Sequence, residues 1–237
     1  MTSQNLKNLI KELNVASDKE KAKIYQRFFK TGKGEYGEGD IFIGVTTPKM
    51  KEIAKKYSNL SLKDVKILLS NKIHEYRSCA LAILVNKFNK TDSSERKNIF
   101  NIYIKNAKSN KINNWDLVDC SADKIVGAYL FDENPEILRK LAKSKNLWEK
   151  RIAIVSTFHF IKNNKHEKTI EISEILVNDK HDLIHKAVGW MLREVGKRVS
   201  QEKEEEFLER HHKTMPRTML RYAIERFDDK KKKYYMS

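Results

Sequence analysis

Proline, cysteine and long apolar runs are scarce in this 237-residue chain, which holds 3 Pro and 2 Cys. The two cysteines, Cys79 and Cys120, are too few for a disulfide framework or a cysteine-based zinc site. With so few prolines and abundant Lys, Leu, Ile, Glu and Ala, the composition favours helices. No run approaches the roughly 20 apolar residues that span a bilayer, and the first residues lack an apolar signal core. We therefore expect a cytoplasmic protein with no membrane partner.

The sequence also lacks the short motifs of several enzyme classes. It contains no HExxH zinc helix and no GxSxG nucleophile elbow, and its glycines do not form the GxxxxGK[ST] phosphate loop. The histidines are scattered, without the spacing of metal ligands. We therefore expect neither a metal nor another cofactor.

Charge of one sign dominates, because 48 Lys and Arg face 32 Asp and Glu and the formal net charge is +16. A folded cytoplasmic protein this basic usually meets a polyanion, and nucleic acid is the commonest one. A second explanation stays open, since AT-rich genomes raise the content of lysine, asparagine and isoleucine without any nucleic acid being bound. The charge favours a nucleic-acid partner and does not identify it.

The few glycines are concentrated, with five of the eight falling in residues 31–44. This segment lacks the alternating Asp and Asn ligands of a calcium loop. We interpret it as an ordered loop between two helices, with glycines at positive φ. Its flanks agree, because Asp18 is suited to cap a helix that runs to about Lys30, and Thr47-Pro48 is a typical helix start.

Apolar residues recur at helical spacing through the rest of the chain, as in residues 65–69, 81–88 and 170–176. No segment alternates convincingly as a strand would. Short polar breaks at residues 89–94 and 162–165 separate the helices. We predict an all-α protein that forms a single domain over residues 1–237, with a basic tail from about residue 228 that is frayed and solvated.

A repeat emerges when Arg77 is taken as a reference position near the start of a helix. Matching positions follow at intervals of 37, 37, 35 and 35 residues: Asn114, Arg151, Lys186 and Arg221. This period fits two-helix units of the HEAT type, which stack into a curved α-solenoid. Four of the five reference positions are basic, so we predict a positive stripe along the concave face that binds DNA through Arg77, Arg151, Lys186 and Arg221.

Trp115 and Asp119 stand out because they lie four residues apart and share one helix face. A carboxylate in a basic groove weakens phosphate binding, so its presence suggests that a positive charge develops there. Trp190 lies near the reference position Lys186. Plainer explanations remain open, since tryptophan in amphipathic helices usually packs in the core and Asp116 suits the first turn of a helix.

With these residues the sequence resembles the AlkD-like DNA alkylation-repair family, which are glycosylases built from HEAT-like repeats. The similar stretches cover nearly the whole chain in the expected order: residues 29–45, 114–119, 186–197 and 215–227. The resemblance implies a monomeric, monofunctional DNA N-glycosylase of base-excision repair. Its substrates would be cationic alkylated purines, such as 3-methyladenine and 7-methylguanine, in double-stranded DNA.

The resemblance also implies roles for individual residues. The residues that match the family's catalytic aromatic–carboxylate–aromatic set are Trp115, Asp119 and Trp190. The residues that match the family's DNA-contacting positions are Arg151 and Thr47. Arg193, within the similar stretch 186–197, is also expected to bind DNA. Some relatives with this fold lack the catalytic pair and are not active glycosylases, whereas this sequence retains it.

The residue types suit glycosidic bond cleavage. An N-alkylated purine is already cationic and leaves readily, while a nearby carboxylate stabilises the oxocarbenium-like sugar or orients the attacking water. Tryptophan faces favour a cationic base by roughly 0.5–2 kcal/mol each. The alternative is a non-catalytic HEAT-repeat module that binds DNA or scaffolds another protein. Release of bases from methylated duplex DNA distinguishes the two hypotheses.

Overall fold

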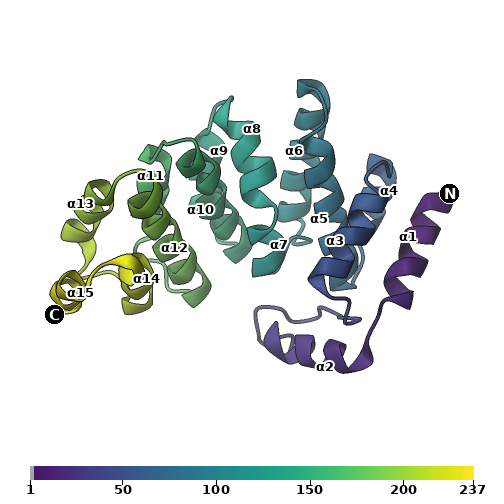
Figure 1. Cartoon of the computed structure of the whole chain (residues 1–237), viewed down its shortest axis with the longest axis horizontal. Helices are drawn as coiled ribbons and strands as arrows, with labels where there is room; N and C mark the ends of the chain where they lie inside the picture. The colour runs from purple at the N-terminus through teal and green to yellow at the C-terminus, as the bar shows by residue number, and fades with distance from the viewer. Residues whose placement is uncertain (1–2) are drawn as a thin grey trace. The chain divides into compact units, whose positions relative to one another are not determined.

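A computed structural model describes residues 3–237, and helices make up most of it (Figure 1). Within these residues there is no strand, only one isolated bridge between Ile41 and Ile73. The predicted all-α fold class is confirmed. No helix in the described part is long and apolar enough to cross a membrane. The chain divides into two compact units, of which unit 1 ends at Ser121 and unit 2 begins at Ala122; the single domain stays a prediction.

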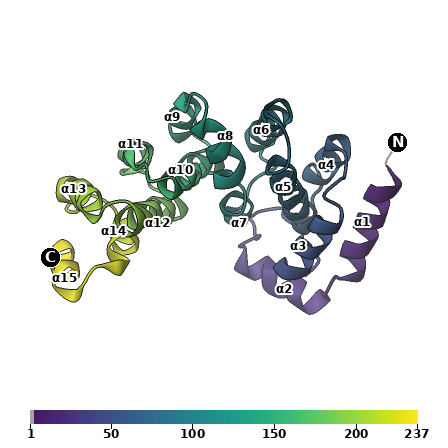
Figure 2. The same ribbon diagram turned by 45° about the horizontal axis from the view of Figure 1, so that its top comes forward.

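Unit 1 is built around its most extensively buried helix, α5. Its helices are α1 (Gln4–Val15), α2 (Lys19–Phe28), α3 (Thr47–Lys56), α4 (Leu62–Leu69), α5 (His74–Phe88), α6 (Ser93–Lys108) and α7 (Trp115–Asp119). Helices α3, α4, α6 and α7 all pack against α5. Figure 2 shows α4 and α6 on one side of α5 and α3 on the other.

Unit 2 is a two-layer stack of helix pairs. It starts with a π-helical turn, η1 (Asp123–Gly127), and continues through α8 (Ala128–Phe131), α9 (Glu136–Ala142), α10 (Leu147–Lys162), α11 (Glu167–Leu176), α12 (Asp182–Arg198), α13 (Gln201–His211), α14 (Arg217–Ala223), the 3-10 turn η2 (Ile224–Arg226) and α15 (Asp229–Met236). Helix α12 packs between α10 and α14, while α9 packs on α11. Helices α10, α12 and α14 form one layer, and α9, α11 and α13 the other (Figure 2).

The reference positions coincide with helix starts throughout the chain. Arg151, Lys186 and Arg221 are each the fifth residue of their helices, α10, α12 and α14, and Arg77 is the fourth residue of α5. Asn114 caps α7. The register therefore describes how the helices α5, α7, α10, α12 and α14 begin, although assignment of the helix pairs to the HEAT type stays a prediction.

The glycine-rich loop has the predicted conformation. Gly34, Gly39 and Gly44 have φ of 80°, 84° and 84°, the left-handed region that favours glycine. A Cβ on Gly44 would lie 2.0 Å from the backbone oxygen of Asp18. Asp18 caps α2 as expected by accepting from Glu20 N at 3.0 Å. The loop therefore folds back tightly onto the start of α2.

The basic tail differs from the prediction of a frayed, solvated end. Residues Asp229–Met236 form helix α15, capped by Asp228. Tyr235 is only 2% exposed, and its hydroxyl donates to Glu209 Oε1 at 2.9 Å. The run of four lysines suggested a solvated end, whereas the buried Tyr235 anchors the helix.

Candidate active site and nucleic-acid interface

The short helix α7 carries two of the three predicted catalytic residues. Its cap, Asn114, is fully buried and accepts from Trp115 N at 2.9 Å. Leu117 and Val118 are 1% and 0% exposed and anchor the helix in the core of unit 1. Trp115 and Asp119, at the two ends of α7, remain half-buried.

Aromatic rings from α2 and the loop after it hold the Trp115 indole. Phe29 stacks on it, with ring centroids 5.2 Å apart and planes 20° apart. Phe28 meets it edge-on at 5.9 Å and is itself 62% exposed. The indole Nε1 donates to Tyr36 Oη at 3.2 Å. Trp115 thus joins a fixed aromatic surface instead of filling the core.

A buried charged cluster lies beside α7. His74 Nδ1 is 3.0 Å from Asp40 Oδ2, and His74 Nε2 is 2.8 Å from Asp116 Oδ2. Burial alone would lower the pKa of His74, but the charge of Asp116 and the hydrogen bonds to both carboxylates outweigh it and raise the pKa to about 9. His74 is therefore an imidazolium at neutral pH. Asp116 is a partner of that cation, which the plain first-turn explanation did not anticipate.

Asp40 is the centre of this cluster. Burial would raise its pKa, but the hydrogen bond from His74 and the charge of Arg77 hold the pKa of Asp40 below its ordinary value. Arg77 Nη2 donates to Asp40 Oδ1 at 2.6 Å, and Nη1 donates to two backbone carbonyls before α5. The Arg77 side chain is only 4% exposed, so the predicted role of Arg77 as part of a DNA-binding stripe does not fit. Its charge neutralises buried Asp40.

Unit 2 carries the third predicted catalytic residue, Trp190, half-buried on α12. Its ring lies 5.9 Å from Phe158 of α10. Two cations lie over Phe158, Lys162 Nζ at 4.4 Å and Arg198 at 5.3 Å from the ring centroid. Trp190 thus belongs to an aromatic pair with positive charge around it, within unit 2.

The remaining predicted DNA contacts have different environments. Arg151 is 5% exposed and donates to the Leu183 backbone oxygen at 2.5 Å. Arg193 is held by Glu225. Lys186 pairs with Asp182 at 2.6 Å. Exposed positions belong to Arg221 on α14 and, in unit 1, to Thr47 at the start of α3. Burial of Arg77 and Arg151 means that the four basic reference positions do not form one evenly exposed stripe.

Sequence reasoning missed most of the residues that support Trp115. Tyr36 and Asp40 lie in the glycine-rich segment that the sequence already marks as ordered, and Phe28 and Phe29 directly precede it. His74 looked like one scattered histidine because its partners lie 34 and 42 residues away. Only the concentration of glycines signalled that this segment is fixed by specific contacts.

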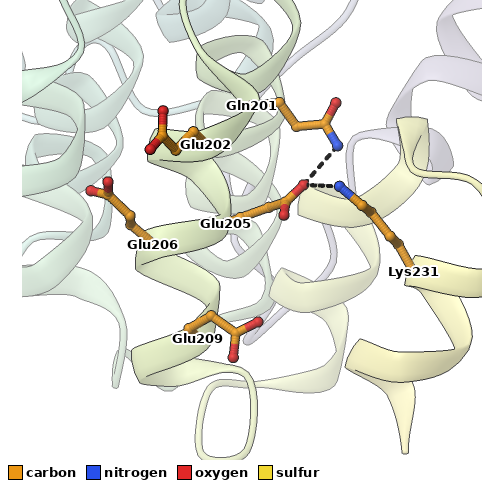
Figure 3. A pocket seen from close by; sticks show the side chains of 6 residues that line it. All are labelled: Gln201, Glu202, Glu205, Glu206, Glu209 and Lys231. Carbon is orange, nitrogen blue, oxygen red and sulfur yellow. Dashed lines mark hydrogen bonds and ion pairs between the residues drawn. The ribbon is translucent and has the colours of Figure 1, made fainter.

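An acidic hollow of about 450 Å³ lies on α13, and none of the predicted site residues lines it. Four glutamates line it, with Gln201 and Lys231: Glu202, Glu205, Glu206 and Glu209. Figure 3 shows Gln201 and Lys231 both reaching Glu205. Carboxylates repel phosphate, so this side of α13 is unsuited to DNA.

The stacked helix pairs define an all-helical protein of the α-solenoid class. Its short helix α7 carries an aromatic residue and a carboxylate, Trp115 and Asp119. The sequence matches the DNA alkylation repair enzyme family over residues 9–227, and the chain belongs to this family. The resemblance drawn from the sequence is thereby confirmed. The family supports an enzyme of alkylation repair with DNA as its partner.

A solved structure has the same fold as this chain. It is described as a predicted DNA alkylation repair enzyme from Enterococcus faecalis, with 16% sequence identity and a TM-score of 0.70. The match covers 90% of this chain and 97% of that one. At this level of identity the likeness concerns the fold. No match was found among proteins of curated function.

Proposed function

We propose that the protein is a monofunctional DNA glycosylase that excises cationic N-alkylated purines, 3-methyladenine and 7-methylguanine, from duplex DNA. The observation that carries this proposal is the helix α7, where Asp119 follows one turn after a half-exposed Trp115 whose ring is fixed by Phe29. The family supplies DNA alkylation repair as the setting. We place the activity in base-excision repair and expect a monomer.

The reaction changes the charge of both the departing purine and the sugar. When the C1′–N bond breaks, its electron pair goes to the purine and cancels the positive charge of the alkylated ring. The sugar becomes oxocarbenium-like, and water adds its oxygen to C1′ and loses a proton. The carboxylate of Asp119 stabilises the developing charge or orients this water.

Aromatic faces supply selectivity in this proposal. An alkylated purine is a flat cation, and a tryptophan face favours it over the neutral base by roughly 0.5–2 kcal/mol. Trp115 is suited to this because Phe29 and Tyr36 fix its ring at low entropic cost. We assign Trp190 the same kind of contact with the lesion-bearing nucleotide. Thr47, Lys186, Arg193 and Arg221, which all keep exposed surface, are the proposed DNA contacts.

The decisive experiment is single-turnover release of 7-methylguanine from a methylated duplex, together with equilibrium binding to the same duplex. The wild type should release the base faster than an enzyme-free control. Asp119→Asn should slow release by about 10²–10³-fold while affinity holds or rises slightly, because the lost charge acts in the transition state and repels phosphate. Trp115→Ala and Trp190→Ala should slow release and also weaken binding.

The matched control is Asp92→Asn, the same change at the exposed cap of α6, which should behave as the wild type. Full activity in Asp119→Asn would end its catalytic assignment. Binding without any base release by the wild type would instead favour the non-catalytic DNA-binding module.

A further inference from the structure

A buried charge cluster links three segments of unit 1 that are distant in sequence. Asp40 comes from the glycine-rich loop, His74 and Arg77 from the first turn of α5, and Asp116 from α7. The side chains of Asp40, His74 and Arg77 are each no more than 4% exposed. Burying this many charges is costly unless each is paired, and the pairing here converges on the helix that carries Trp115 and Asp119.

We propose that Asp40, His74 and Asp116 are positioning residues, and that the imidazolium of His74 holds α7 in the orientation that base excision requires. This inference rests on the proposed function, because it gives α7 a reason to be held. It assigns none of the three residues to contact with DNA.

Two separate routes connect His74 with Trp115. The first is the hydrogen bond from His74 Nε2 to Asp116, the residue next to Trp115 in α7. The second is a column of stacked rings: His74 on Phe42 at 4.3 Å, Phe42 on Phe29 at 4.8 Å, and Phe29 on Trp115 at 5.2 Å. The ring planes differ by 21°, 15° and 20° along the column. A shift of the imidazole therefore moves the backbone at Trp115 through Asp116, and the indole ring through Phe42 and Phe29.

The charges around His74 explain why its proton matters. The charged groups that act on it are Asp40 from the loop, Asp116 from α7 and Arg77 from α5; Glu75 is its neighbour in the chain. Glu75 is engaged elsewhere, since its carboxylate accepts from Ile43 N and Gly44 N. Arg77 already neutralises Asp40. The imidazolium therefore balances chiefly the charge of Asp116.

Loss of this proton would break one of the two hydrogen bonds. A neutral imidazole has a single N–H donor, so one ring nitrogen would turn a lone pair toward a carboxylate oxygen. The Asp116 side chain is 22% exposed and that of Asp40 only 4%, so water can replace the lost donor at Asp116 but not at Asp40, and the contact that weakens is the one to Asp116. Helix α7 would then lose its charged tether while the loop stays bound to α5.

The test compares Asp116→Asn with the wild type and with Asp92→Asn, which makes the same substitution at the exposed cap of α6. Removing the negative charge of Asp116 should lower the pKa of His74 by about one to two units. NMR of the His74 ring protons measures this pKa. Titrating His74 should shift the indole N–H resonance of Trp115 in parallel. Trp115→Phe identifies that resonance among the three tryptophans.

The functional readout is the pH profile of single-turnover base release at saturating enzyme, corrected with an enzyme-free control at every pH. Wild type and Asp92→Asn should lose activity together only as the pH rises through about 9. Asp116→Asn should match them near pH 6 and lose activity earlier, being about three- to 25-fold slower at pH 8.5 for a His74 pKa lowered by about one to two units. A residue needed only for folding would change the melting temperature and leave this profile in place.

The proposal is overturned if Asp116→Asn keeps the wild-type profile, or if the Trp115 indole does not respond when His74 titrates. These outcomes are distinct from failure of the proposed function. If the wild type releases no base at any pH, the glycosylase assignment fails, while the coupled NMR titration still decides whether His74 positions α7.

Discussion

Burial decides what each basic side chain of this protein does, even where the residues share one register. Arg77 and Arg221 both lie near the start of a helix that follows a short link. Arg77 is 3% exposed and neutralises Asp40 inside unit 1. Arg221 is exposed on α14. The first is part of the core and only the second is available to a phosphate.

Alanine substitution should separate these two roles. Arg77→Ala leaves the carboxylate of Asp40 without its cation and should lower the free energy of unfolding by roughly 3–5 kcal/mol, as measured by urea unfolding. DNA affinity of the folded protein should change little. Arg221→Ala should do the reverse, weakening duplex binding without a change in stability. Equal stability of Arg77→Ala and the wild type would contradict the structural role of Arg77.

Glu204 gives a second prediction at this scale. The residue is 2% exposed, and its Oε1 has no hydrogen-bond partner among the described residues. Burial, with a smaller contribution from the charge of Glu205, raises the pKa of Glu204 to about 9. An acid whose pKa rises on folding takes up a proton when the chain folds, so its presence costs stability increasingly as the pH rises from 4.5 toward 9.

Glu204→Gln should therefore stabilise the protein by on the order of 1–3 kcal/mol at pH 8 and by much less at pH 5. Thermal unfolding at the two pH values measures the difference. The control is Glu202→Gln, an exposed glutamate on the same helix, which should show no such trend. A stabilisation that is the same at both pH values would argue against a buried, protonated Glu204.

At the scale of elements, glycine sets how closely the helices of unit 2 approach. A Cβ on Gly189 would lie 2.3 Å from the backbone oxygen of Met219 and 2.5 Å from the Tyr222 Cβ. Helix α12 can pack this closely on α14 only because the position carries no side chain. Backbone atoms cannot rotate away, so the added methyl group must push the two helices apart.

Gly189→Ala should thus destabilise the protein by about 1–3 kcal/mol, although alanine is the better helix former by itself. Lys197→Ala, at an exposed position of the same helix, is the control and should be nearly neutral. Urea unfolding followed by circular dichroism measures both. A stabilised Gly189→Ala variant would mean that the two helices pack less closely than described.

Features that depend on neighbouring residues could be predicted from the sequence, whereas contacts between distant segments could not. Helix starts were accessible, since caps such as Asp18 and the 35–37-residue register depend on local residue types. The partners of His74 were not, because hydrogen bonds across 34 and 42 residues leave no periodic signal. The same limit applies to Arg77, whose sequence position suggests a surface cation. For α15, the lysines hid the buried Tyr235.

At the scale of the whole molecule, the net charge of +16 predicts how the protein meets DNA. Binding should release counterions, so the logarithm of the association constant should fall linearly with the logarithm of salt concentration, by about 0.9 per phosphate contacted. Fluorescence anisotropy of a labelled duplex over a range of KCl concentrations measures the slope.

Arg221→Ala should reduce the magnitude of this slope by about one if the residue holds a single phosphate. Glu202→Gln, on the acidic side of α13, should leave it unchanged. Because phosphates carry no sequence or lesion information, damaged and undamaged duplexes should give similar slopes; an affinity that does not respond to salt would contradict binding through basic residues.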